Sequence, residues 1–461
     1  MSSSAEQLAA NASWQTFARS KDLQARIWFT LGMLLIYRVG TVVPLPGIDI
    51  AAFQSIFANA PGIFEQINLF AGGALERMSI FMLSIFPYIS ASIIMQLMRA
   101  VFPTLDQLQK EGESGRRQVQ QYTRYLTVIL AMGQSLVIGI ALQGLQTSFG
   151  QSMVTEPGVV FLISTTVTLT AGTVFLMWLG EQITARGIGN GISLLIFVGI
   201  VASFPATFGS LFADIRQGDF IGSALPILAV IVGAIALLVL IVFVERAIRK
   251  VPIIYPQRMQ GGRQTQAEQQ FLPLKLNTAG VIPAIFAFTL STLPLSLGQL
   301  TDSSSNPVLV WFSTNLAGGS PLYYLFFGGM VAFFCFFYTA IVFNPEDTAE
   351  NLRNSGAVVA GGIRPGKQTA AYLDFILSRL TVIGAAYLVF VVIVPEVARY
   401  QGGINIFLGG TSLLIVVSVT IDTVNQVQSH LVAQQYESLI QKSLATQPKR
   451  RDSSRRKKSR R

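Results

Sequence analysis

Apolar residues occur along almost the whole chain in long runs of about 20 residues, the length that an α-helix needs to cross a bilayer. Shorter polar segments separate these runs. The pattern predicts an all-α membrane protein with ten membrane-spanning helices. The predicted spans are 27–44, 78–98, 125–144, 158–180, 190–208, 223–244, 278–298, 321–343, 380–397 and 404–423.

Two of the runs are interrupted. The second contains Pro87, Ser90 and Ser92 and follows the polar segment NLFAGGALER, and the seventh contains Pro283 and Pro294. A broken helix at membrane depth persists only where protein or a water-filled cavity satisfies its freed backbone groups. We therefore expect these two runs to face protein or a cavity rather than lipid.

Composition agrees with a membrane protein and excludes several other classes. The chain is 51% hydrophobic and 12% charged, whereas a soluble domain has roughly 25% charged residues. A single cysteine (Cys335) and a single histidine (His430) exclude a disulfide scaffold and a His/Cys metal site. No Ser-His-Asp set or pair of catalytic carboxylates is evident, so we expect no enzyme activity, catalytic residue, metal or cofactor.

The formal charge of +10 is sorted by side. Residues 449–461 carry +8 of it. With ten spans both termini lie on one side, and 29 of the 33 Lys and Arg residues fall there, against only Arg216 and Arg399 on the other. The positive-inside rule then places both termini in the cytoplasm.

Ten spans divide into five and five, and an odd number per half forces an inverted repeat if the halves are related. The alternative is a chance even division. No acid lies in the middle of a span. Glu181, Glu245 and Asp422 lie at span ends, where headgroup water can solvate them, and Arg38 is expected to snorkel or to pair with a neighbouring helix. The expected parts are an N-terminal segment 1–26, halves 27–210 and 211–425, and a C-terminal tail 426–461.

Two loops on the cytoplasmic side, 245–276 and 344–379, are long and in places basic. Loops of this length are usually functional or disordered. In the second loop, GGIRPG predicts a turn that presents Arg364 and Lys367. Retention of positive charge alone would not require long loops, so we expect a docking surface. The glycines of GIGNG (187–191) lack phosphate-loop spacing and are expected to form a loop that leads into a helix.

Several blocks, in order, resemble the SecY/Sec61-alpha family, the channel-forming subunits of bacterial-type Sec protein translocases. The resemblance runs from about residue 20 to 440. The blocks are INLFAGGALERMSIFMLSIFPYISASIIMQLM (67–98), KEGESGRRQVQQYTRY (110–125), MWLGEQITARGIGNGIS (177–193), LPLKLNTAGVIPAIFA (272–287), FFCFFYTAIVFNPEDTAENLRNSGA (333–357), GIRPGKQTAAYLD (362–374) and GGTSLLIVVSV (409–419).

The resemblance implies a ten-helix bundle of two inverted halves around an hourglass pore. Unfolded secretory polypeptides would cross through the pore, and transmembrane segments would leave sideways into lipid through a lateral gate. It implies a pore ring of Ile85, Ile89, Ile196, Ile285 and Ile415. It also implies a plug at 65–75 that includes Asn68, Leu69, Phe70, Gly72 and Gly73, and gate residues Ser90, Ile93 and Ile282.

The two long loops would then dock the SecA motor ATPase or the ribosome, which would supply the energy. The docking residues are Arg249, Lys250, Arg258, Arg263, Arg364 and Lys367. The implied partners are the small membrane subunits SecE and SecG, SecA, the ribosome through its RNA phosphates, secretory and membrane-protein precursors and anionic lipids. Accessory translocon proteins could join them. The basic tail is either a contact for RNA or anionic lipid or a solvated segment.

The implied location is the plasma (inner) membrane, or the thylakoid membrane if the source is photosynthetic. Two other functions are compatible with ten spans. One is a small-solute transporter, which predicts an ionisable group at mid-depth that the sequence lacks. The other is an insertase or assembly scaffold without an aqueous pore.

Overall fold

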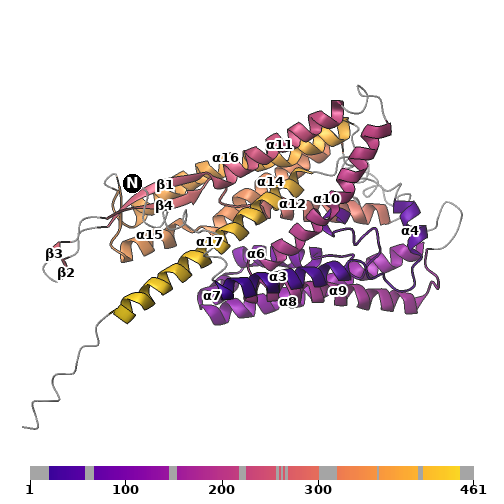
Figure 1. The fold of residues 1–461 in the computed structure, drawn as a ribbon, viewed down its shortest axis with the longest axis horizontal. Coiled ribbons are helices and arrows are strands. Elements are labelled where there is room, and N and C mark those ends of the chain that lie inside the picture. Colours follow the sequence, from indigo (N-terminus) through magenta and orange to yellow (C-terminus); the bar gives the residue numbers. More distant parts are fainter. Residues whose placement is uncertain are drawn as a thin grey trace, which may run out of the picture.

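The computed structural model describes residues 20–57, 67–144, 153–217, 225–255, 259–260, 263–264, 268–300, 319–360, 363–402 and 409–446. Helices dominate this part of the chain, and short strands occur in only two regions (Figure 1). The helices are α3 (Lys21–Gly40), α4 (Ile50–Phe57), α6 (Phe86–Val101), α7 (Pro103–Lys110), α8 (Glu113–Gly144), α9 (Val159–Arg186), α10 (Gly191–Gln217), α11 (Leu225–Arg246), α12 (Ile282–Leu300), α14 (Pro321–Val342), α15 (Pro345–Asn354), α16 (Lys367–Gly402) and α17 (Gly410–Thr446).

Each of the predicted spans overlaps one of these helices, which confirms the all-α architecture. By length and composition, five of the described helices could cross a membrane. They are α8, α9, α14 continued into α15, and the larger parts of α16 and α17. The pair α6 and α7, bent by 102°, is a sixth candidate. The shorter apolar helices Gly191–Ala206 and Ile282–Ser291 lie within α10 and α12.

The second span is helical only in its later part. Residues 71–85 form turns, and α6 begins at Phe86 rather than near residue 78. Gly72, Gly73, Met78 and Ser84 have positive φ angles in this stretch, which a continuous helix does not permit. Pro87 falls in the first turn of α6, where its missing N–H breaks no helical hydrogen bond. The predicted interruption therefore precedes the helix.

The helices form two groups that lie side by side (Figure 1). In the first half, α8 contacts α9 and α6, and in the second half α14 contacts α12 and α16. Among the described elements, the strongest contacts between the halves fall into two sets. We call the contact of α6 with α12 the α6–α12 seam, and the contacts of α17 with α10 and α3 the α17 seam.

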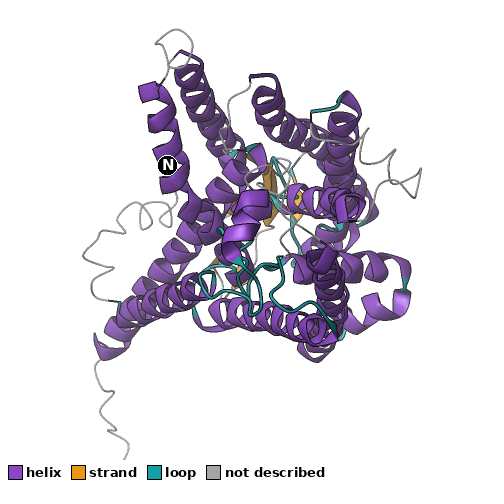
Figure 2. Cartoon of the chain, turned by 90° about the vertical axis from the view of Figure 1, so that its right-hand side faces the viewer, coloured by secondary structure: helices purple, strands orange, loops and turns teal. Residues whose placement is uncertain are grey.

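The largest group of buried apolar side chains lies between the halves. It draws on α3, α6, α9 and α10 from the first half and on α11, α12, α14, α16 and α17 from the second. Seen from the end of the molecule, the helices surround loops in the interior (Figure 2). The core of this protein is therefore an interface between two halves.

The two long loops meet in one small sheet. The strand order is β4 (Glu268–Lys275), β1 (Ile248–Tyr255) and β5 (Val358–Val359), all antiparallel. A second pair, β2 (Met259–Gln260) and β3 (Arg263–Gln264), lies between β1 and β4 in the chain. Buried Val251, Leu274 and Val359 cluster with Leu380 of α16. This packing fixes the sheet on α16.

Candidate functional site

The isoleucines expected to form a ring come together between the halves. Ile85, Ile89, Ile196 and Ile415 are buried in the same apolar cluster, and partly buried Ile285 packs against it. They come from α6 and the residue before it, α10, α12 and α17. Branched aliphatic side chains offer no hydrogen bond to a hydrated ion, so a constriction built from them resists wetting.

The expected plug segment occupies the same cluster through Phe70. The ring of Phe70 lies 4.6 Å, centroid to centroid, from Phe288 of α12 and 6.3 Å from Phe86 of α6. Phe86 and Phe288 are 6.2 Å apart. Three rings from three elements thus meet at the α6–α12 seam. Residues 65–66 of the expected plug lie outside the described residues.

Helix α3 holds the backbone of this segment. Tyr37 Oη donates a hydrogen bond to the carbonyl oxygen of Ala71 (3.3 Å), and Arg38 Nη1 donates one to the carbonyl oxygen of Gly72 (2.6 Å). The sequence suggested snorkelling or a helix-to-helix pair for Arg38, but its guanidinium binds the backbone of the expected plug segment. A charged donor makes a stronger hydrogen bond than a neutral one.

A close backbone approach also holds the expected plug segment against α10. Gly72 has a φ of +67°, and a Cβ there would lie 3.0 Å from the Cα of Gly199 in α10. A Cβ on Gly199 would lie 2.8 Å from the carbonyl oxygen of Phe70. Only glycine fits this crossing without displacement. Gly199 and Tyr37 were not predicted, because the contact joins residues far apart in the chain.

The side chain of Asn68 closes the expected plug segment by two hydrogen bonds to Glu76. Its Oδ1 accepts a hydrogen bond from the backbone N–H of Glu76 (3.0 Å), and its Nδ2 donates one to Oε2 of the Glu76 carboxylate (3.2 Å). Gly73 has a φ of +81° between them. Leu69 is buried. All five predicted plug residues therefore belong to one compact turn.

The expected gate residues belong to α6 and α12, the two helices of the α6–α12 seam. Ser90 and Ile93 of α6 are buried, and Ile282 at the start of α12 is partly buried. Among the described residues, the hydroxyl of Ser90 has no hydrogen-bond partner. The seam is thus largely aliphatic and aromatic where its side chains are described.

A hydrogen bond crosses the α17 seam beside a small apolar cluster: the backbone N–H of Gly189 donates to Oε1 of Gln426 in α17 (2.8 Å). Within the first half, the backbone N–H of Ile188 donates to Oγ1 of Thr30 in α3 (3.1 Å). Leu23, Ile188 and Leu431 form a buried cluster beside these bonds. The loop GIGNG leads into α10, as predicted, and holds α3 and α17 together.

The acids at the ends of the predicted spans differ in their surroundings. Asp422 is exposed, and its Oδ1 lies 3.6 Å from Nζ of Lys275. Glu181 accepts two hydrogen bonds from Arg124, from Nε to Oε1 (2.8 Å) and from Nη2 to Oε2 (2.7 Å). Glu245 is only 8% exposed, so the expectation that water solvates it is wrong. The amide of Asn277 donates to it instead (2.8 Å). Among the described residues, no group of three His, Cys, Asp or Glu could hold a metal ion.

Most of the expected docking residues of the two loops lie within the described part of the chain. Arg249 and Lys250 of β1 are exposed, as are Arg364 and Lys367. Lys367 is the first residue of α16, and the φ of Gly366 is +105°, so the predicted turn forms. Arg263 belongs to β3. Arg258 lies outside the described residues.

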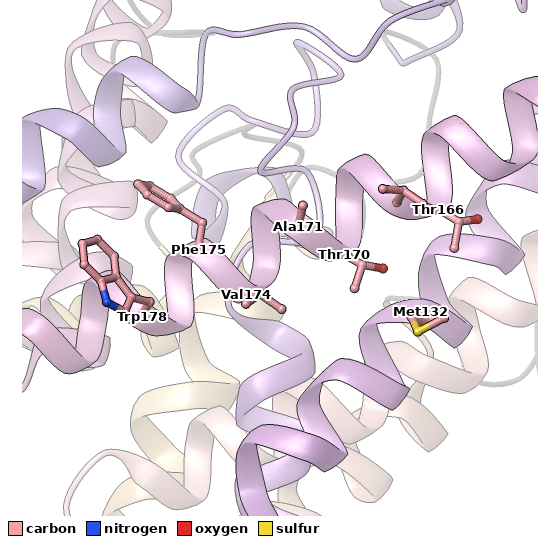
Figure 3. A pocket seen from close by; sticks show the side chains of 8 residues that line it. Met132, Thr166, Thr170, Ala171, Val174, Phe175 and Trp178 are labelled. Atoms are coloured by element: carbon pink, nitrogen blue, oxygen red, sulfur yellow. The ribbon is translucent and has the colours of Figure 1, made fainter. Parts of the chain in front are cut away.

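An apolar groove of about 600 Å³ opens on the outer face of α8 and α9 (Figure 3). Phe175, Trp178 and Met132, which are partly exposed, line it with the small side chains of α9. A lipid-facing surface with small residues allows another helix to approach closely. No pattern in the sequence marks this groove.

Comparisons with known proteins agree with this geometry. The family model SecY matches residues 79–424. The protein translocase subunit SecY of Vibrio cholerae is 48% identical over 427 residues, which cover 92% of this chain and 95% of that protein. A solved structure described as a protein conducting channel has a TM-score of 0.65 at 18% identity and covers 88% of this chain and 92% of its own. Sec61 in the canine ribosome-channel complex has a TM-score of 0.62 at 18% identity, with the same coverage.

Proposed function

This chain belongs to the SecY family, and we propose that it is the central protein-conducting channel of a Sec translocon. Unfolded secretory polypeptides pass between its two halves, and transmembrane segments leave through the α6–α12 seam into lipid. The relatives are named translocase subunits, so a small-solute transporter is not supported.

The observation that carries the proposal is the arrangement at the centre of the molecule. The ring isoleucines Ile85, Ile89, Ile196 and Ile415 are buried in one cluster between the halves, with Ile285 against it, and Phe70 of the plug is buried in the same cluster. A narrow aliphatic constriction with a displaceable cap closes a pore to ions and can fit loosely around an extended chain. The burial of Phe70 in this cluster supports a pore that the plug keeps closed.

The proposed gate follows from the nature of the α6–α12 seam. Lipid tails are as apolar as the side chains of Ile93 and Ile282, so contacts of this kind exchange readily for lipid or for an apolar segment of the passing chain. We assign Ser90, Ile93 and Ile282 to the edges of this gate. The halves 27–210 and 211–425 move as the two jaws.

The sheet built by the two long loops is the proposed docking surface for SecA or the ribosome. Arg249, Lys250, Arg364 and Lys367 present exposed positive charge there, and Arg258 and Arg263 belong to the same loops. Such groups bind phosphates strongly but without sequence selectivity. Nucleotide hydrolysis belongs to the partner. The basic tail 449–461 adds contacts to RNA or to anionic lipids.

The remaining partners and the location complete the proposal. The small membrane subunits SecE and SecG bind from the lipid side, and the groove of α8 and α9 is one seat for a single-spanning helix. The channel lies in the plasma (inner) membrane, or in the thylakoid membrane of a photosynthetic source, with both termini in the cytoplasm. The sorting of Lys and Arg supports this orientation.

Reconstitution tests the function directly. The purified chain with its small subunits, in liposomes with SecA and ATP, should carry a secretory precursor into a protease-protected lumen. Deleting residues 65–75 should make the same liposomes leak ions. Transport without leakage in the deletion variant would favour a pore-free scaffold, and no transport by the intact complex would contradict the proposal.

A further inference from the structure

A short polar connection joins the proposed docking sheet (β4, β1 and β5) to α12, the helix of the proposed gate that we call the gate helix. We call this connection the α11–α12 joint. It comprises Glu245, Ala247, Leu276, Asn277 and Gly280. Helix α11 ends at Arg246 and β1 begins at Ile248. On the return path β4 ends at Lys275 and α12 begins at Ile282. The N–H of Leu276 donates to the carbonyl oxygen of Ala247 (2.9 Å), so the pairing of β1 with β4 continues into the joint.

Asn277 is the centre of the joint. Its Nδ2 donates to Oε1 of Glu245 at 2.8 Å and to the carbonyl oxygen of Gly280 at 3.0 Å. Its Oδ1 accepts from the N–H of Gly280 at 3.1 Å. Asn277 is 2% exposed. One amide thus binds the end of α11 on one side and the turn that starts α12 on the other.

Burial makes this geometry specific. A carboxylate or amide taken out of water costs free energy unless hydrogen bonds satisfy it. The bonds of Asn277 offset that cost only while Glu245 and Gly280 keep their positions, so the joint favours one arrangement of α11 and α12. Apolar contacts such as those of the α6–α12 seam impose no comparable direction.

The second half of the molecule supports the joint. A Cβ on Gly384 of α16 would lie 3.3 Å from the carbonyl oxygen of Leu276, so α16 lies tight against it. Lys275 is the last residue of β4, and its Nζ lies 3.6 Å from Oδ1 of Asp422 in α17. These contacts leave little freedom for the sheet to tilt without moving residues 276–280.

We propose that Asn277 is a positioning residue that couples the docking sheet to the gate helix α12, an inference that rests on the proposed channel function. A partner that pushes or pulls on β4 moves Asn277, and the bonds to Gly280 pass this displacement to the start of α12. Glu245 is the fixed point against which the displacement acts. Asn277 touches neither the partner nor the passing chain.

The test separates docking from its consequence. Asn277→Ala, Glu245→Ala, Glu245→Gln and the control Thr278→Ala are compared with the parent chain in liposomes with SecA. Thr278 is matched because its hydroxyl donates to the backbone carbonyl oxygen of Lys275 in the same turn (3.0 Å) and, among the described residues, binds no part of α11. Two quantities are measured, the affinity for SecA and the amount of precursor transported per ATP hydrolysed.

Asn277→Ala and Glu245→Ala are expected to keep the affinity and to lower transport per ATP about tenfold, the size of one buried hydrogen bond to a charged group. Glu245→Gln should retain coupling, because its side-chain carbonyl still accepts from Asn277. Glu245→Ala covers a failure of Asn277→Ala to fold, since it leaves the turn to Gly280 intact. Normal coupling in a folded Ala variant, or affinity and coupling lost in equal measure, would overturn the inference. If the parent chain itself transports nothing, the channel function has failed and not the joint.

Discussion

The α6–α12 seam and the α17 seam join the same two halves by different kinds of contact. At the α6–α12 seam the rings of Phe86 and Phe288 meet across the halves, with the ring of Phe70 between them. At the α17 seam a directional bond from Gly189 to Gln426 crosses beside an apolar cluster. The first seam has the plug against it, and the second has the loop before α10.

In a bilayer this difference makes the two seams unequal in the free energy needed to separate them. Helices in lipid gain no hydrophobic free energy from meeting each other, because lipid tails are equally apolar. An apolar seam is therefore inexpensive to separate, whereas a seam with hydrogen bonds leaves polar groups unsatisfied when it separates. We infer that the α17 seam is the hinge and the α6–α12 seam the opening.

The largest expected effect comes from closing the α6–α12 seam covalently. In a Cys335→Ser background, Phe86→Cys with Phe288→Cys places two thiols where the ring centroids are 6.2 Å apart. Joining them should reduce both transport and membrane insertion to background, since α6 and α12 can no longer separate. Precursor protection from protease in liposomes measures the loss.

The control links the other seam. Leu23→Cys with Leu431→Cys joins α3 to α17 within their buried cluster and should leave transport close to that of the reduced protein. Reduction of the first link should restore its transport. If both links lowered transport equally, the result would contradict the inference that the α17 seam is the hinge and the α6–α12 seam the opening.

A smaller effect is expected from filling the seat of the plug. Gly199→Val forces side-chain atoms against the carbonyl oxygen of Phe70, where even a Cβ would lie at 2.8 Å. Overpacking of this kind costs about 2 kcal/mol, which would raise the unseated fraction about thirtyfold. Single-channel recording should show resting ion conductance. Gly133→Val is the control, because nothing lies within 4 Å of a Cβ there, and leakage from both variants would contradict the seat.

Removing one ring from the α6–α12 seam should have a weaker effect of the same sign. Phe288→Leu loses the contact with Phe70 at 4.6 Å, worth about 1 kcal/mol beyond area burial. Resting conductance should rise about fivefold. Phe286→Leu is the matched control, because its ring contacts lie within the second half, on Phe334 and Tyr338 of α14. Equal resting conductance in the two variants would contradict a role for the α6–α12 seam in holding the plug.

The smallest effect is expected at the hinge. Gln426→Ala removes the acceptor for the N–H of Gly189 at 2.8 Å and should lower the free energy of unfolding by about 1 kcal/mol. Thermal denaturation in detergent measures this change. Resting conductance should stay at the level of the parent chain, and an open channel in this variant would mean that the α17 seam also serves as the gate.

Much of the fold was predictable, because runs of apolar residues report directly on membrane helices. All ten predicted spans overlap a helix. Pro87 and Pro283 mark where α6 and α12 begin, whereas α12 continues through Pro294, so the predicted break at that proline is wrong. The start of α6 was less predictable. Residues 78–85 are apolar enough to continue a helix, yet the positive φ angles of Met78 and Ser84 come from tertiary packing that no local pattern reports.

Contacts between distant residues account for the rest. The pairing of β1 with β5 joins residues 253–254 to 358–359, and neither loop alone predicts a sheet. The resemblance located the plug but not its seat, because Gly199 and Tyr37 contact it from other helices. Glu245 was predicted to be solvated because it lies at the end of a span. Nothing in the sequence indicates that Glu245 and the amide of Asn277 are buried together.

Crosslinking from the interior tests the central claim most directly. A single cysteine is placed at Ile89, which is buried among the ring residues, in the Cys335→Ser background, and a secretory chain is stalled in transit. The comparison is Val160→Cys on α9, where the native side chain is 83% exposed on the outer face. The account predicts a crosslink from position 89 to the stalled chain and none from position 160. A chain that crosslinks at 160 and not at 89 would contradict a path between the halves.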